Sequence, residues 1–214
     1  MEIPRDWTFK TADVAKGFDQ HVREQLPWYD LMSGATAHIA RHYIPDGGIV
    51  YDLGCATGNI GNLLRETLDA RHCDFRPIDN SETMRDAYTG PGELQVADFS
   101  TLTFPRFDVA ILFLSLMFIP RKMRGRLVEQ LRTNVEKGGV IVVVDKMESI
   151  GGYLGTAISR LALAGKVAAN VPAGDIIAKE LSLAGVQRPL SFEELRPATE
   201  VFRFGEFAGY VIET

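Results

Sequence analysis

Apolar and polar positions follow two alternating patterns along most of this chain. In several segments, apolar residues recur every three or four positions, as in Ile60, Leu64 and Leu68, which predicts amphipathic helices. Between these segments, short apolar runs predict five buried strands: residues 49–53, 75–79, 94–98, 107–114 and 140–145. A strand followed by a helix, repeated along the chain, predicts a parallel sheet with helices on both faces.

The pattern changes near both ends of the chain. Further helices are predicted in residues 19–42 (with a break near Pro27), 153–169 and 176–183. Residues 201–204 and 207–212 predict two strands around Gly205-Glu206, and because two residues cannot form a parallel crossover, this hairpin must be antiparallel. The helix that follows the fourth strand is expected to include Val135 and to stop at Lys137-Gly138-Gly139.

Together these elements predict a Rossmann-like, doubly wound α/β fold. Its sheet has seven strands, from five parallel βα units and a C-terminal antiparallel hairpin. We expect residues 1–214 to form a single domain, with N-terminal cap helices in residues 18–44 and inserted lid or dimer helices in residues 151–186.

Composition narrows the class of protein. Of the 214 residues, 46% are hydrophobic and 24% charged, as in an ordinary globular domain, and the net charge of −5 disfavours a nucleic-acid substrate. The basic cluster at residues 121–126 is interpreted as the solvated start of a helix rather than an anion site. Cys55 and Cys73 suit a reducing compartment, and no apolar run has the length of a membrane span, so we expect a cytoplasmic protein.

Residues 51–59, Tyr-Asp-Leu-Gly-Cys-Ala-Thr-Gly-Asn, are placed where the first strand turns into the first helix of the sheet. Nucleotides bind at this position in doubly wound folds, and Gly54 and Gly58 let the backbone approach a ligand closely. The spacing is neither the Gly-x-Gly dinucleotide motif nor a phosphate-binding P-loop. Asp52 would repel a pyrophosphate but attract a ligand with a cationic amino-acid group.

Two further acids are expected at the ends of the next strands. Asp79 is placed to accept both hydroxyls of a ribose, and Asp98 to accept from an exocyclic adenine amine, with Phe99 against the ring. Each has a structural alternative, because Asp79 could cap the helix that begins near Ser81 and Asp98 could begin a turn. Three acids at three successive strand ends favour the cofactor interpretation.

With Gly138-Gly139 before the fifth strand, the motifs at residues 52–58, 78–81 and 97–98 resemble the class I S-adenosylmethionine-dependent methyltransferases. The resemblance implies S-adenosyl-L-methionine as cofactor and no metal. The cofactor-binding residues that follow are Asp52, Gly54, Cys55, Ala56, Thr57, Gly58, Asp79, Asn80, Met84, Asp98, Phe99 and Leu114.

Within that superfamily, residues 51–55, 78–81, 26–29 and 202–205 look like the carboxy-S-adenosylmethionine synthase branch. That branch uses prephenate to make a carboxylated cofactor for modifying a tRNA wobble uridine. An arginine that holds the cofactor carboxylate in the branch aligns here with Glu180, next to Lys179. An anion would repel that carboxylate and tolerate a sulfonium, so plain methyl transfer is favoured over carboxy-cofactor synthesis.

Methyl transfer requires mainly in-line positioning of a nucleophile, with a base where a proton must leave. The candidate catalytic residues are Tyr29, Ser115, Lys146 and Glu180, with Asp145 and His21 as weaker ones. His38 and His42 share a helix face, but without a third ligand they do not indicate a metal site.

Residues 151–185 are the expected source of acceptor specificity. Residues 161–165, Leu-Ala-Leu-Ala-Gly, are apolar on more than one side, so a lid, a substrate or a second subunit must cover them. Relatives in the resembled branch form dimers through comparable helices, which implies a homodimer here, with a monomer that has a mobile lid as the alternative. The leading hypothesis is a small-molecule methyltransferase without membrane contact. A carboxy-cofactor synthase and a non-catalytic cofactor-binding protein remain the alternatives.

Overall fold

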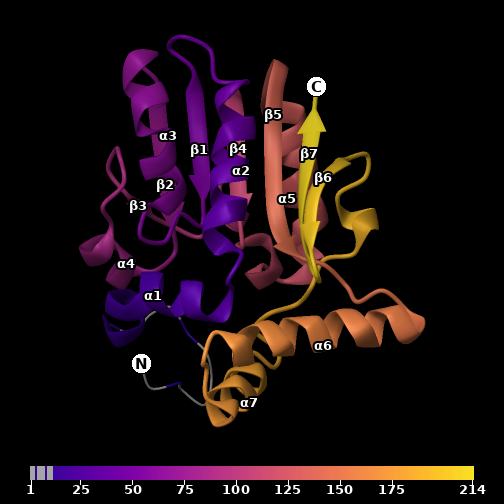
Figure 1. The fold of residues 1–214 in the computed structure, drawn as a ribbon. Helices are drawn as coiled ribbons and strands as arrows, with labels where there is room; N and C mark the ends of the chain where they lie inside the picture. Colours follow the sequence, from indigo (N-terminus) through magenta and orange to yellow (C-terminus); the bar gives the residue numbers. More distant parts are fainter. Residues whose placement is uncertain (1–2, 4–7, 9–11) are drawn as a thin grey trace.

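The computed structural model of the chain describes residues 3, 8 and 12–214, apart from the side chains of residues 12–14 and 16. In the described part, one seven-stranded sheet has the order β3-β2-β1-β4-β5-β7-β6 (Figure 1). The strands are β1 (Ile49–Leu53), β2 (Asp74–Asp79), β3 (Gln95–Val96), β4 (Phe107–Phe113), β5 (Val135–Lys146), β6 (Thr199–Phe204) and β7 (Phe207–Glu213). The predicted fold class is confirmed.

The parallel pairing of the strands brings their carboxyl ends together at one edge of the sheet. Strands β3, β2, β1, β4 and β5 pair in parallel, while β7 pairs antiparallel with both β5 and β6. Because parallel strands point the same way, Leu53, Asp79 and Phe113 end β1, β2 and β4 at the same edge. A ligand site between these strand ends is the usual consequence of this topology.

The described residues form seven α-helices: α1 (Ala12–Gln25), α2 (Tyr29–Arg41), α3 (Asn59–Ala70), α4 (Glu82–Ala87), α5 (Arg121–Asn134), α6 (Gly152–Ala168) and α7 (Ala173–Ser182). Alternate residues of the central strands face opposite layers. Val109 and Ile111 pack with α2 and α3, whereas Ala110 and Leu112 pack with α5. Both faces are buried, which explains why the central strands are continuously apolar.

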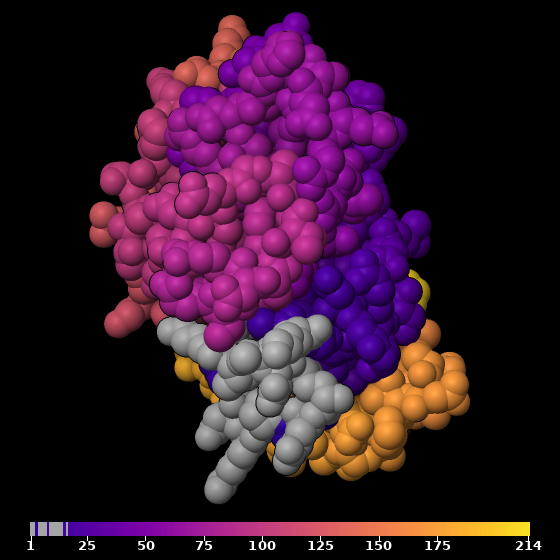
Figure 2. All heavy atoms as spheres, turned by 90° about the vertical axis from the view of Figure 1, so that its left-hand side faces the viewer, coloured from indigo at the N-terminus to yellow at the C-terminus, as the bar shows by residue number. Residues whose placement is uncertain are grey.

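Helices α1, α6 and α7 lie beyond the carboxyl ends of the parallel strands rather than on a face of the sheet (Figure 1). Figure 2 shows the same arrangement from the side, with the indigo N-terminal helices against the orange segment that contains α6 and α7. The short helix η2 (Leu116–Phe118) follows β4 at this edge. These elements form a roof over the strand ends.

One predicted boundary is wrong. The helix after β4 does not include Val135 but ends at Asn134, and β5 begins at Val135, which is buried and pairs with Phe107. Pairing resumes at Val140 with Val109, and Gly138, with φ of +83°, accommodates the irregularity between. The free energy gained by burying Val135 in the sheet exceeds what one more helical residue would contribute.

The basic cluster at residues 121–126 begins α5, as predicted, but one of its members is not solvated. Arg124 is fully buried and donates hydrogen bonds to the carbonyls of Ile119, Met117 and Arg188, and its guanidinium pairs with Glu194 at 3.4 Å. A buried guanidinium requires such a set of partners. Arg124 therefore ties the segment after β4 to the segment before β6.

Candidate functional site

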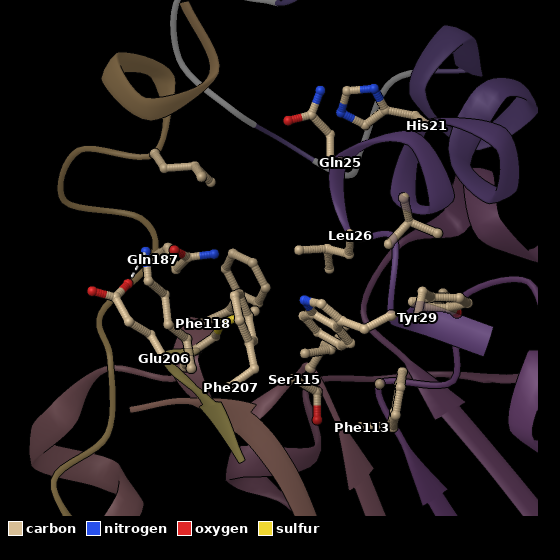
Figure 3. A pocket seen from close by; sticks show the side chains of 18 of the residues that line it. His21, Gln25, Leu26, Tyr29, Phe113, Ser115, Phe118, Gln187, Glu206 and Phe207 are labelled. Carbon is tan, nitrogen blue, oxygen red and sulfur yellow. Dashed lines mark ion pairs between the residues drawn. The ribbon is translucent and has the colours of Figure 1, made fainter. Parts of the chain in front are cut away.

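A cavity of about 630 Å³ lies between the strand ends and the roof helices. Figure 3 shows Ser115 and Phe113 at its sheet side, and His21 and Gln25, from α1, on the opposite side. Gln187 and Glu206 lie on a third side, from the loop after α7 and the β6–β7 turn. Residues far apart in the sequence therefore meet around one space.

The glycine loop predicted to bind the cofactor forms one wall of this cavity. The backbone N–H groups of Gly54 and Cys55 both donate to the Ile78 carbonyl, at 2.7 and 3.1 Å, which fixes the loop to the end of β2. Gly54 and Gly58 have φ of +86° and +92°, and Ala56 has φ of 47°. Gly58 is the N-cap of α3, and this left-handed path turns the chain from β1 into that helix.

Asp52 is the most unusual acid of the site. It is only 1% exposed, and its Oδ2 has no hydrogen-bond partner among the described residues. Burial, together with the nearby charge of Asp79, raises the pKa of Asp52 to about 7. A buried carboxylate without a partner costs free energy that a cationic ligand would recover.

Asp79 is held by the loop that it faces. Its two carboxylate oxygens accept from the N–H groups of Ala56 and Ser81, each at 3.0 Å. Burial raises its pKa, against the opposing effect of these backbone donors. Asp79 thus connects the glycine loop to the start of α4 and also lines the cavity.

Asp98 follows its structural alternative. Its Oδ1 accepts from the N–H and hydroxyl of Ser100, at 2.9 and 2.6 Å, and so caps the short helix η1 (Phe99–Thr101). The neighbouring Phe99 is buried and lines the cavity. Phe99 therefore lies on the cavity wall, and Oδ1 of Asp98 is engaged by Ser100.

Most of the predicted cofactor residues line the cavity: Asp52, Gly54, Cys55, Ala56, Asp79, Asn80, Met84, Phe99 and Leu114. Thr57, Gly58 and Asp98 do not. Thr57 donates its hydroxyl to Asp19 at 2.7 Å, and Gly58 packs close to the backbone of Gly90. Thr57 and Gly58 therefore hold the glycine loop in its conformation without lining the cavity.

All four predicted catalytic residues line the same cavity. Ser115 follows Leu114, whose φ of 56° is uncommon for a leucine, and its hydroxyl is buried without a partner in the described chain. Strained backbone next to an unsatisfied hydroxyl is typical of functional sites. Tyr29 packs edge-on against Phe113, at 5.5 Å between ring centroids, and burial raises its pKa. Its phenol therefore stays protonated.

Lys146 and Glu180 each belong to an ion pair. Lys146 lies 3.5 Å from Glu206, the contact dashed in Figure 3, and Glu180 lies 2.9 Å from Lys166. Burial opposes ionisation of Glu180, but the hydrogen bond and charge of Lys166 outweigh it and lower its pKa. Glu180 is thus a compensated anion. Asp145 accepts from the N–H of Met117 at 3.1 Å and holds the segment after β4.

Three polar residues of the roof were not singled out by the sequence: Gln25, Lys166 and Lys179. Gln25 lies one helical turn after His21, so the two share a face of α1. That spacing is visible in the sequence, but nothing in it indicates that Lys179 of α7 would be near enough to affect His21. His38 and His42 pack ring against ring at 5.0 Å, and no group of three or more potential metal ligands occurs among the described residues.

A family model described as a methyltransferase domain matches residues 51–143, which run from β1 into β5. Two similar curated proteins are carboxy-S-adenosyl-L-methionine synthases. The one from Staphylococcus epidermidis is 23% identical, over 97% of each protein. The one from Geobacter sp. strain M21 is 28% identical, over 66% of this chain and 62% of that protein. The chain thus spans less than two thirds of the Geobacter relative.

Two solved structures share the fold. The plantazolicin methyltransferase BpumL aligns with a TM-score of 0.63 and 13% identity, over 94% of this chain and 89% of that one. Human N-acetylserotonin methyltransferase aligns with a TM-score of 0.56 and 15% identity, over 95% of this chain and 56% of that one. At these identities the likeness concerns the fold. In the described residues, no helix has the length and apolarity to cross a membrane.

Proposed function

This chain carries a class I S-adenosylmethionine-dependent methyltransferase domain, and we propose that it transfers a methyl group to a small-molecule acceptor. The observation that carries the proposal is Asp52, a fully buried carboxylate with one unpartnered oxygen on the cavity wall. The α-ammonium group of S-adenosyl-L-methionine is a cation that can pair with it.

The other residues fit the rest of that cofactor. Asp79 has a carboxylate at the strand end beside Asp52, where ribose hydroxyls can donate to it, and Phe99 offers an aromatic surface for the adenine. At Gly54 an added Cβ would overlap the Cβ of Ser115, so the close approach of the cofactor loop to the segment after β4 requires glycine. When bound, the cofactor supplies an activated methyl group on its sulfonium.

The acceptor would then occupy the part of the cavity between Ser115 and the roof. This part is bounded by aromatic side chains, including Phe113, Phe118 and Phe207 (Figure 3), so an apolar acceptor body fits it. Ser115 would orient the acceptor by a hydrogen bond, and the protonated phenol of Tyr29 would donate rather than remove a proton. The expected rate acceleration comes from exclusion of water and alignment of the acceptor with the methyl group.

A second candidate is carboxy-S-adenosylmethionine synthesis, which the names of the curated relatives favour. From the sequence, the negative charge of Glu180 is expected to repel the carboxylate of a carboxylated cofactor. Because Lys166 pairs with the Glu180 side chain, Glu180 opposes a carboxylated ligand less than its sequence position implies. We keep methyl transfer as the leading function, since the arginine of that branch has no counterpart at this position.

We further propose that residues 1–214 act as one domain, with caps in residues 18–44 and 151–186, and that two copies associate through α6. Three large apolar side chains of α6 are exposed and do not line the cavity: Tyr153, Leu154 and Val167. Exposed apolar groups gathered on one helix are typical of an interaction surface.

Mass spectrometry of the native protein, followed by incubation with S-adenosyl-L-methionine and candidate acceptors, tests the function. S-adenosylhomocysteine formed with an acceptor heavier by one methyl group is the expected result. A ligand heavier than the cofactor by one carboxyl group would establish the synthase instead. A chain that binds the cofactor and never consumes it with any acceptor would be a binding protein, and one that does not bind it would overturn the proposal.

A further inference from the structure

Two buried polar groups on opposite sides of the cavity have no hydrogen-bond partner among the described residues: Oε1 of Gln25 and Oγ of Ser115. Gln25 is the last residue of α1 and is 8% exposed, and Ser115 follows Leu114 and is 7% exposed. Figure 3 shows Gln25 on the roof side and Ser115 on the sheet side. A buried oxygen without a partner costs free energy, so both groups favour a ligand that supplies the missing hydrogen bond.

The two groups differ in the partner that each requires. Oε1 of Gln25 is an amide carbonyl oxygen, which can only accept, so its partner must carry an N–H or an O–H. The Ser115 hydroxyl can donate or accept. Ser115 also packs against the cofactor loop, because a Cβ added to Gly54 would overlap its side chain. The sheet end of the acceptor part is therefore next to the cofactor, and the Gln25 end is remote from it.

The charged side chains in the described lining of the roof side compensate one another. Lys146 lies 3.5 Å from Glu206, and Lys166 lies 2.9 Å from Glu180. A carboxylate that entered this region would compete with a glutamate for its lysine, and an ammonium would compete with a lysine for its glutamate. Each would also lose part of its hydration, so neither charge gains a net advantage here.

Two further basic side chains on this side, Lys179 and His21, carry little charge. Burial is the main cause that lowers the pKa of Lys179 to about 6 and the pKa of His21 to about 4. Both side chains are therefore largely uncharged at neutral pH. The roof side of the cavity thus differs from the sheet edge, where Asp52 and Asp79 favour a cation, and it is suited to a neutral group.

Aromatic rings line the cavity as well. They belong to Trp28, Phe113, Phe118 and Phe207. The rings of Trp28 and Phe207 lie against each other, with 4.5 Å between their centroids. Such a wall offers both ring faces and ring edges, against which another flat ring packs favourably. An aromatic acceptor body therefore fits this lining better than a flexible polar one.

We propose that the acceptor is an uncharged aromatic compound, with an N–H or O–H that donates to Oε1 of Gln25 and its opposite end at Ser115. This inference rests on the proposed function and names the acceptor class of the same site. Gln25 would bind the end of the acceptor that is remote from the cofactor, so it determines specificity rather than taking part in the chemistry. The aromatic rings would hold the acceptor body between these two hydrogen bonds.

Isothermal titration calorimetry with matched phenols tests the inference. The protein, saturated with S-adenosylhomocysteine at about pH 7, is titrated with 4-hydroxybenzamide, methyl 4-hydroxybenzoate, 4-hydroxybenzoate and 4-hydroxybenzylamine. The amide and the ester are neutral, and of these two only the amide has an N–H at the end away from the phenol. The acid and the amine are charged at that end. A second set, with two methylene groups inserted before the polar end, represents a longer acceptor. Within at least one set, we expect the amide to bind tenfold or more tighter than each of the others, a difference of about 1.4 kcal/mol or more.

Variants locate the effect. Gln25→Leu should reduce the advantage of the amide over the ester to within about threefold, while the Kd for S-adenosylhomocysteine stays within about threefold. Ser115→Ala should weaken the amide and the ester equally, because both carry the same phenol. Gln20→Leu is the matched control, since Gln20 is an exposed glutamine on the same helix, bonded to Glu24 at 2.7 Å, and it should change nothing.

The outcomes separate the two proposals. Failure to bind S-adenosylhomocysteine would remove the proposed function whatever the roof binds. If that ligand binds, an acid or amine that binds as tightly as the amide would overturn the uncharged acceptor. An ester that equals the amide, or an advantage of the amide that persists in Gln25→Leu, would overturn the role of Gln25. Probes of both sets that all bind more weakly than about 10 mM would overturn the acceptor class.

Discussion

Gly54 and Ser115 lie so close together that a Cβ added to Gly54 would overlap the Cβ of Ser115 and lie 3.2 Å from its Oγ. The contact joins the loop after β1 to the segment after β4, two neighbouring strands of the sheet. The absence of a side chain at Gly54 thus sets the distance between the cofactor loop and the residue expected to face the acceptor.

Gly54→Ala should therefore abolish cofactor binding and destabilise the fold. The new Cβ meets the Ser115 side chain, and the φ of +86° is strained for alanine. We expect a loss of about 2–4 kcal/mol in unfolding free energy by urea denaturation. Gly125→Ala is the matched control, because its Cβ meets nothing within 4 Å on α5, and it should stabilise the protein by about 1 kcal/mol. Equal effects of the two substitutions would refute this account.

Asp52→Asn should stabilise the ligand-free protein at high pH and weaken cofactor binding. The folded-state pKa of Asp52, about 7, exceeds its ordinary value of 3.8, so the folded chain binds more protons than the unfolded chain between these values. Its contribution to stability falls as pH rises through that window, and the cost is complete above it. The variant should therefore exceed the wild type by about 2–4 kcal/mol at pH ~8 and match it below pH ~4.

The same variant should bind S-adenosyl-L-methionine about 10- to 100-fold more weakly, since a charge-assisted pair becomes a neutral one. Thermal unfolding across pH and calorimetric titration of the cofactor provide the two measurements. Asp69→Asn is the control, because that carboxylate is exposed on α3 and does not line the cavity. A ligand-free stability difference that does not grow with pH would contradict the placement of a buried, uncompensated carboxylate at Asp52.

Ser115→Ala should separate chemistry from cofactor binding. The hydroxyl is buried without a partner among the described residues, so its removal should leave unfolding free energy unchanged or raise it by about 1 kcal/mol. If the hydroxyl orients the acceptor, kcat should fall about tenfold while the Kd for S-adenosyl-L-methionine stays within about threefold. Steady-state kinetics and titration measure both. A kcat within about twofold of wild type would show that Ser115 lines the cavity without orienting the acceptor.

Much of the sheet and the cofactor wall could be predicted from the sequence because both depend on local signals. The runs at β1 and β4 are buried on both faces, so most of their residues are apolar, with Asp52 and Asp108 as the exceptions. The loop in residues 52–58 depends on its glycines and on hydrogen bonds to the end of the neighbouring strand. The sequence order and the parallel pairing of β1 and β2 determine which strand end is the neighbour. The placement of Asp79 beside that loop follows from the same rule.

What could not be predicted depends on contacts between distant segments. From the sequence, Arg124 is expected at the surface as part of a basic cluster. Its burial depends on partners from other segments, among them the carbonyls of Met117 and Arg188 and the carboxylate of Glu194. The sequence alone predicts an uncompensated charge at Glu180, because its partner Lys166 is on another helix. For Asp98 the sequence favoured a cofactor contact over a turn, and the structure shows its Oδ1 in local hydrogen bonds to Ser100.

Glu206→Ala should loosen the roof over the cavity. The Glu206 carboxylate accepts from the hydroxyls of Ser149 and Ser159, each at 3.1 Å, and pairs with Lys146. Ser159 is on α6, so this residue anchors that helix to the β6–β7 turn. Hydrogen exchange should become about tenfold faster or more in residues 152–168, with α3 unchanged. Glu193→Ala, at an exposed ion pair, is the control. Unchanged exchange in α6 would show that other contacts hold it.

The exposed side of α6 predicts self-association. Tyr153 and Val167 are 80% and 60% exposed and, 14 residues apart, lie close to one side of the helix, and neither lines the cavity. In a twofold dimer each substitution occurs twice, so Tyr153→Glu with Val167→Glu would replace four apolar side chains at the interface by charged ones. We expect a dimer for the wild type and a monomer for the double variant, with dimerisation weakened about 100-fold or more.

Light scattering coupled to size-exclusion chromatography over a range of protein concentrations measures this difference. Leu31→Glu, at a position on α2 that is 77% exposed, is the matched control, because it removes an exposed apolar side chain far from α6 along the chain. A wild type that is monomeric at every concentration would leave α6 as a lid of a single chain. A double variant that remains dimeric would place the interface elsewhere. Either result would overturn the dimer proposal without affecting the cofactor wall, which lies on the sheet edge.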